Sequence, residues 1–237
     1  MLKFARFLAE DPFEIHKQLN PLLWDRNNRL LPEVKEKLLQ FAEAWGAFAK
    51  IPPAMVNDII LTGGNAGFLY NGQSDLDVHL LVDRAALGYG PLVDDFLQDR
   101  KTLWSVKHHI TVKGIPVEPY AQDLSERPPA GQGIYSLRND VWIQFPSAIT
   151  YDPAADPVLA KKVAHWMGVI DKVIKERRPL SEFQGIRKKL SDMRKRGLAR
   201  RGELDRDNLI FKALRNSGHI DRMNNYVAQE TDRELSS

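Results

Sequence analysis

The sequence of 237 residues contains no cysteine. Disulfide bonds and thiolate metal sites are therefore excluded, and any metal ion bound by this chain has to be held by oxygen or nitrogen donors. A chain without cysteine also suits a reducing compartment, so we expect a cytoplasmic protein.

Long apolar stretches and a P-loop are missing as well. No apolar run reaches the roughly 18 residues that a membrane span needs, so we expect no membrane partner. In residues 1–17, acidic side chains appear by residue 10 and interrupt the apolar residues, unlike in a signal peptide. We therefore expect this segment to form a short amphipathic helix. The run TGGNAG at 62–67 lacks the Lys-Ser or Lys-Thr of a P-loop, which disfavours ATP hydrolysis by that route.

The net charge of +3 hides an uneven distribution of charge along the chain. Residues 161–222 contain 18 Lys or Arg and 8 Asp or Glu, a balance of +10, whereas the rest of the chain has a balance of −7. A basic region of this kind predicts contact with a polyanion such as RNA. Ordinary solvated helix faces are the alternative interpretation.

Two aspartates at the start of an apolar run are the most informative residues. Asp75 and Asp77 lie two positions apart, so a strand places both carboxylates on one face. Two ionised carboxylates side by side repel each other, and a cation between them relieves the repulsion. Oxygen donors of this kind favour Mg²⁺ or Mn²⁺, often together with substrate phosphates. Upstream, the Gly63-Gly64 turn leaves the backbone free to approach a phosphate closely.

A third acid lies further along the chain, in a predicted hairpin over residues 108–120 with its turn at Lys113-Gly114. Glu118 stands alone on an otherwise apolar strand, where it completes a site of three carboxylates and helps to activate an attacking hydroxyl. Pro119 cannot donate a ladder hydrogen bond, so we expect the strand to end there or to lie at an edge. An edge charge that blocks aggregation is the alternative interpretation of Glu118.

In this pattern the sequence resembles the DNA polymerase beta-like nucleotidyltransferase superfamily. The likeness is closer to the predicted nucleotidyltransferases of tailed bacteriophages, and it covers most of the chain. The stretches that carry it are LNPLLWD (19–25), SDLDVHLLVD (74–83), VKGIPVEPYAQD (112–123), GIYSLRNDVWI (133–143) and GLARRGELDRDNLIFKALRNSGHI (197–220).

The resemblance implies a metal-dependent enzyme that moves a nucleoside monophosphate from an NTP to an acceptor hydroxyl and releases pyrophosphate. It would act in the host cytoplasm if a phage encodes it. The implied catalytic and metal-binding residues are Asp75, Asp77 and Glu118, and the implied nucleotide-binding residues are Gly63, Gly64 and Ser74.

Two positions depart from the family pattern. Many relatives have Ser where this chain has Gly64, and either Thr62 or Asn65 is a candidate to replace the missing hydroxyl. The third acid is often aspartate, whereas Glu118 is longer by one methylene.

The acceptor and the class of protein stay open at this point. An RNA 3′ end, a protein hydroxyl and a second nucleotide all fit the same site, and the basic region favours RNA among them. The alternatives are a non-catalytic or virion-associated phage protein that retains the fold, and a regulator that nucleotidylates (AMPylates) a partner protein.

The predicted fold class is α/β (α+β), with a small mixed sheet and flanking helices followed by an all-helical region. We assign residues 1–150 to a catalytic domain and residues 151–237 to a basic helical region. The predicted strands and hairpins cover 57–62, 75–82, 108–120 and 134–145, and the predicted helices cover 32–50, 91–104, 156–177, a segment from Ser181 to Gly197, and 204–216. Ser181 and Gln184 resemble a capping box.

Four other polar residues are interpreted as structural rather than catalytic or metal-binding. His79 shares a strand face with Asp77, and we interpret it as a packing or hydrogen-bonding residue. The pair His108-His109 cannot easily share one ion, because adjacent strand residues face opposite ways, so we expect a structural or surface role. Asp83 ends a strand and is expected to cap or turn the chain.

Overall fold

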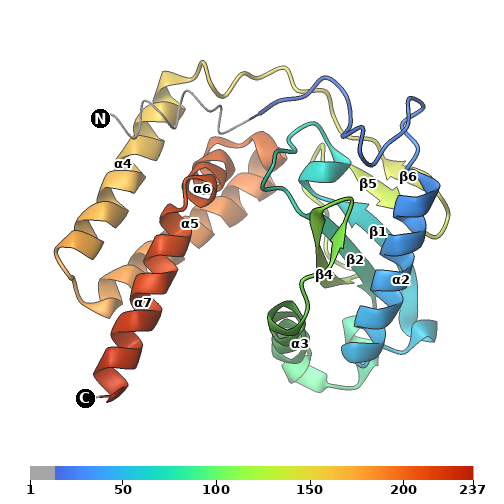
Figure 1. Cartoon of the computed structure of the whole chain (residues 1–237), viewed down its shortest axis with the longest axis horizontal. Coiled ribbons are helices and arrows are strands. Elements are labelled where there is room, and N and C mark those ends of the chain that lie inside the picture. The colour runs from blue at the N-terminus through green and yellow to red at the C-terminus, as the bar shows by residue number, and fades with distance from the viewer. Residues whose placement is uncertain (1–13, 237) are drawn as a thin grey trace. The chain divides into compact units, whose positions relative to one another are not determined.

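The computed structural model describes residues 14–236 (Figure 1). The chain divides into two compact units, Ile15–Ala148 and a second one whose described part comprises Glu14 and the residues from Ile149 onward. The amphipathic helix predicted over residues 1–17 lies mostly outside the described residues, and residues 14–17 carry no helix. The domain boundary at residue 150 stays a prediction, because compactness alone does not show that a unit folds independently.

A six-stranded mixed sheet forms the centre of the first unit, in the order β3-β4-β2-β1-β5-β6. Strand β1 pairs antiparallel with β2 and β5, whereas β2 pairs parallel with β4. The predicted fold class is thereby confirmed. The strands are β1 (Val56–Thr62), β2 (Leu76–Val82), β3 (Thr111–Val112), β4 (Ile115–Asp123), β5 (Ile134–Ser136) and β6 (Val141–Gln144).

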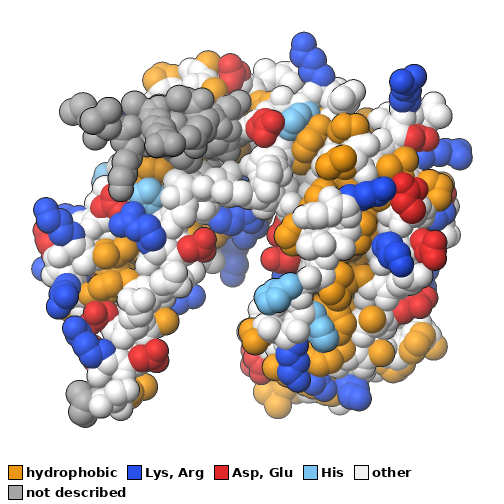
Figure 2. Space-filling model, viewed as in Figure 1, with side chains coloured by type: hydrophobic (Ala, Val, Ile, Leu, Met, Phe, Trp, Pro, Cys, Tyr) orange, Lys and Arg blue, Asp and Glu red, His pale blue; other side chains and the backbone are white. Residues whose placement is uncertain are grey.

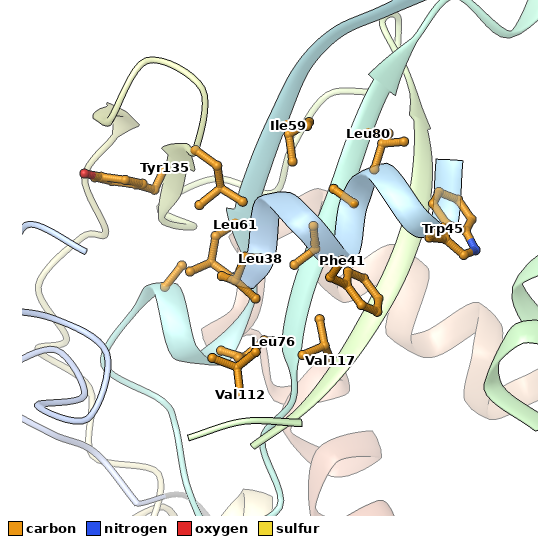
Figure 3. Close-up of a cluster of buried hydrophobic side chains, with 14 of the residues drawn as sticks. Leu38, Phe41, Trp45, Ile59, Leu61, Leu76, Leu80, Val112, Val117 and Tyr135 are labelled. Carbon is orange, nitrogen blue, oxygen red and sulfur yellow. The ribbon is translucent and has the colours of Figure 1, made fainter. Parts of the chain in front are cut away.

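Helix α2 (Pro32–Phe48) covers one face of this sheet, and α3 (Val93–Lys107) packs against α2 through Trp104 and reaches Glu118 of β4 with Lys101. Proline suits the first turn of α2, and Leu38, Phe41 and Trp45 recur at helical spacing and are all buried. Figure 3 shows α2 crossing the sheet with these side chains directed at the strands. On β2, burial alternates strictly, so the apolar residues face α2 and Asp77 lies on the opposite face.

In the described part of the second unit, four α-helices have a hydrophobic core of their own. They are α4 (Pro157–Lys175), α5 (Leu180–Arg201), α6 (Arg206–Asn216) and α7 (His219–Ser236). Their core contains Ile170, Phe183, Leu190, Leu209 and Leu214. Among the described residues, no helix is long and apolar enough to cross a membrane.

Two boundary predictions in this unit were wrong. Helix α5 continues through Gly197 to Arg201, because Gly197 is a packing position rather than a stop. A Cβ there would lie 2.8 Å from Oδ1 of Asp205, which caps α6. The capping box predicted at Ser181 is absent as well, since α5 starts at Leu180 after Pro179 and has no side-chain cap.

Asp156 provides a stability prediction for the helical unit. It caps α4 and also accepts hydrogen bonds from Tyr151 and Arg206. Burial raises its pKa, but these hydrogen bonds outweigh burial and bring the pKa down to about 2. A lowered folded-state pKa stabilises the protein above the unfolded-state pKa, so this contribution should fade as pH falls from about 4 to about 2. Urea unfolding across this range should show a smaller pH dependence for Asp156→Asn than for the wild type.

Candidate metal centre

The sheet brings together the three acids that the sequence singled out. Asp77 on β2 is the register partner of Glu118 on β4, and Asp75 lies directly before β2. One carboxylate oxygen from each residue lies within 4.8 Å of the other two. All three side chains are half-buried. Three clustered carboxylates form an all-oxygen donor set, which suits Mg²⁺ or Mn²⁺.

The parallel pairing of β2 with β4 explains how residues so far apart in sequence meet. Parallel strands need a crossover connection, and the chain makes it through α3 before entering β4. We expected the strand either to end at Pro119 or to lie at an edge there, and the second alternative is confirmed. Strand β4 continues to Asp123, but β3 pairs with Ile115 and Pro116, and among the described residues no strand lies on that side of Pro119.

Gly63 makes room for one of the acids. Its φ of +76° and ψ of −160° form a backbone conformation that is essentially restricted to glycine. A Cβ at this position would lie only 1.8 Å from Oδ2 of Asp77. The turn therefore packs its backbone directly against the acid pair, as close as a glycine permits.

Gly64 is less constrained. Its φ is not positive, and a Cβ there would lie 3.4 Å from both Oγ of Ser74 and the carbonyl oxygen of Leu69, which is ordinary contact. Ser74 itself closes a local turn, because its hydroxyl accepts a hydrogen bond from the backbone N–H of Asn71 at 2.9 Å. The structure thus places Gly63 against Asp77, and Gly64 close to Ser74, which directly precedes Asp75 in the chain.

Neither proposed substitute for the missing serine is available for a ligand. The Thr62 hydroxyl is buried and donates to the carbonyl oxygen of Gly133 at 2.9 Å. The Asn65 side chain is buried too, and its amide donates to the carbonyl oxygen of Asp75 at 2.8 Å. Both side chains hold the turn and the acid-bearing segment in place, so the suggestion that they replace the hydroxyl was wrong.

Sequence reasoning missed a cation at the third acid. Nζ of Lys101, on α3, lies 3.1 Å from Oε2 of Glu118. Nothing in the local pattern around Glu118 signals this contact, because it depends on how α3 packs beside β4. The only available signal was a lysine on the helix that connects the two acid-bearing strands.

The other polar positions behave as structural residues. His79 bonds to Gln122 at 2.8 Å and packs edge-to-face on Tyr120, which confirms the expected hydrogen-bonding role. Burial lowers the pKa of His79 to about 4, so the ring is neutral at pH 7. Asp83 caps the short helix η3 (Arg84–Leu87), as expected. His108 is exposed and packs against the ring of Trp104.

Several cations of the basic region 161–222 have partners inside the helical unit. Arg178 pairs with Glu182, Lys188 with Asp192 and Arg200 with Asp205, and Arg194 lies over the ring of Phe211. On the face of the helices that Figure 2 shows, Lys and Arg lie among acidic side chains. The structure therefore adds no support for RNA binding.

Comparisons with known proteins add little to what the residues of the site indicate. No protein-family model and no curated protein matches the chain. Among solved structures, the chain is similar to the STING-associated CdnE c-di-GMP synthase from Capnocytophaga granulosa, at 12% identity and a TM-score of 0.21, over 94% of this chain and 92% of that chain. A score this low carries no argument, and these comparisons provide no link to bacteriophages.

Proposed function

We propose that this protein is a metal-dependent nucleotidyltransferase, which moves a nucleoside monophosphate from an NTP to an acceptor hydroxyl. The observation that carries the proposal is the meeting of Asp75, Asp77 and Glu118 around one point, directly beside the Gly63 turn. A phosphate-approaching turn next to an acidic triad is what such a reaction requires, because the triphosphate and the metal ions have to be held together.

The residues take distinct roles in this proposal. Asp75 and Asp77 hold divalent cations. Glu118 binds the metal ion on the side of the acceptor and orients the attacking hydroxyl. The backbone at Gly63 and Gly64 receives the triphosphate. Bound Mg²⁺ or Mn²⁺ supplies charge stabilisation to the attacking and leaving oxygens. The acceptor oxygen bonds to the α-phosphorus, the bond from this phosphorus to the bridging oxygen breaks with its electron pair passing to pyrophosphate, and the proton of the acceptor hydroxyl passes to water.

The acceptor is the part that experiment has to identify. We propose RNA first, because residues 161–222 carry a net charge of +10 despite their internal pairs. Purified protein would be incubated with each α-³²P-labelled NTP and Mg²⁺ or Mn²⁺, with and without total RNA and cell lysate. Label in RNA, in protein or in a small product identifies the acceptor class. The control is the double variant Asp75→Ala/Asp77→Ala, in which label transfer should disappear.

The outcome of the same incubation decides between the enzyme and its main rival. Absence of transfer together with absence of metal-dependent NTP binding would contradict the enzymatic proposal. It would favour a binding protein that retains the fold.

Gly64→Ser tests the nucleotide-binding turn. A serine fits sterically here, and its hydroxyl would add one hydrogen bond to a charged phosphate. Such bonds contribute about 1.5–3 kcal/mol, so we expect KM for the NTP to fall by about tenfold or more. Steady-state kinetics would measure this, with Gly64→Ala as the control that adds the Cβ without the hydroxyl. Equal KM values for the two variants would place the triphosphate elsewhere.

A further inference from the structure

Lys101 places a positive charge against the third acid. Its Nζ donates to Oε2 of Glu118 at 3.1 Å, with 27% of the lysine side chain and 46% of the glutamate side chain exposed. Partial burial of the lysine weakens the screening of this pair by solvent and salt. The ammonium group therefore acts on the carboxylate that the triad uses.

The surroundings of Lys101 direct its ammonium group toward Glu118. Along α3, Asp94, Leu97 and Lys101 follow one another at helical spacing on one face. With Tyr120 of β4 they line a cavity of about 310 Å³. Lys101 thus lines this cavity, and its Nζ lies 3.1 Å from the neighbouring carboxylate of Glu118.

A carboxylate can bind a metal ion through both of its oxygens, and Lys101 places a positive charge against one of them, Oε2 of Glu118. A cation that approaches Oε2 meets the repulsion of this ammonium group, so Oε1 is the oxygen that favours an ion. This matters for ion choice, because Ca²⁺ takes six to eight oxygens and readily accepts both oxygens of one carboxylate, whereas Mg²⁺ prefers six ligands in an octahedron. Removing a second oxygen from reach therefore disfavours Ca²⁺ more than Mg²⁺.

We propose that Lys101 sets the metal selectivity of the triad, by restricting Glu118 to one metal-binding oxygen and so favouring Mg²⁺ over Ca²⁺. The inference rests on the proposed function. It also gives the longer third acid a physical explanation: Glu118 has more rotamers than an aspartate, and the bond to Lys101 limits them. Lys101 is a positioning residue in this account, since it acts through Glu118.

The test measures ion binding directly and needs no catalysis. Mn²⁺ binding to the full chain would be followed by electron paramagnetic resonance, with displacement by Mg²⁺ and by Ca²⁺, in the wild type, Lys101→Met and Lys101→Arg. Loss of a nearby positive charge strengthens the binding of both ions, so the ratio of the two displacement constants is the readout. In Lys101→Met we expect this ratio to move toward Ca²⁺ by about tenfold. Lys101→Arg should keep most of the preference for Mg²⁺.

Two further variants complete the experiment. In an E118Q background, Lys101→Met should leave the ratio unchanged, because an effect that passes through Glu118 is lost with it. If circular dichroism shows that Lys101→Met has a lower melting temperature than the wild type, Lys101→Gln provides the same comparison.

The failures are distinguishable from one another. An unchanged ratio in a folded Lys101 variant, with both ions still bound, overturns the inference and leaves the proposed function standing. A wild-type protein that binds no divalent ion, with or without NTP, overturns both.

Discussion

Asp77→Asn is expected to abolish nucleotide transfer while the protein keeps its fold. Asp77 lies in register between Thr62 and Glu118, so its carboxylate is central to the triad. Removing metal-based charge stabilisation loses several kcal/mol in the transition state, which corresponds to a loss in rate of about a thousandfold or more. The amide has nearly the same shape as the carboxylate, and it relieves repulsion among three acids. The melting temperature without metal should therefore stay the same or rise.

Two measurements check this expectation. Transfer from labelled NTP gives the rate, and thermal melting with and without Mg²⁺ shows whether the ion still stabilises the folded state. The matched control is Asp99→Asn, because Asp99 is an exposed acid on α3 outside the triad. Full activity in Asp77→Asn would remove this residue from the chemistry.

Gly63→Ala should be nearly as damaging, for a different reason. The backbone conformation alone costs a non-glycine residue about 1–3 kcal/mol. The added Cβ would also lie 1.8 Å from Oδ2 of Asp77, so either the turn or the carboxylate has to move. We expect a lower melting temperature together with loss of Mn²⁺ binding and of transfer.

Gly72→Ala is the matched control for that substitution. Gly72 lies in the same connection between β1 and β2, has no positive φ, and a Cβ there would meet nothing within 4 Å. It should behave like the wild type. A Gly63→Ala protein that binds Mn²⁺ and melts like the wild type would show that the turn is not packed against Asp77 in solution.

The strand-based part of the site was predictable because it depends on local periodicity. The two-residue spacing of Asp75 and Asp77, and the lone Glu118 on an apolar strand, each carry information within a short window. Their shared location depends on the parallel register of β2 and β4, for which single-sequence patterns contain no signal. The contact of Lys101 with Glu118 was unpredictable for the same reason, since it joins a helix to an edge strand.

The helical unit shows where strong local signals mislead. Glycine usually marks helix ends, but Gly197 lies inside α5 because the start of α6 packs against it. Helix α7 was not predicted as a separate element, although Ile220, Met223 and Val227 repeat at helical spacing and pack on the core. The end of the helix predicted over 204–216 agrees with the end of α6 at Asn216, but the amphipathic pattern after it was overlooked.

The crossover between the two acid-bearing strands also makes the protein a practical scaffold. Register, rather than the length of the connection, fixes Glu118 beside Asp77. Between η3 and α3 the chain passes Gly88 and Gly90, which are exposed and have open space around them. Exposed loop positions of this kind tolerate inserted sequence well. A fluorophore or an affinity tag inserted there would stay attached to the first unit and leave the acids where they are.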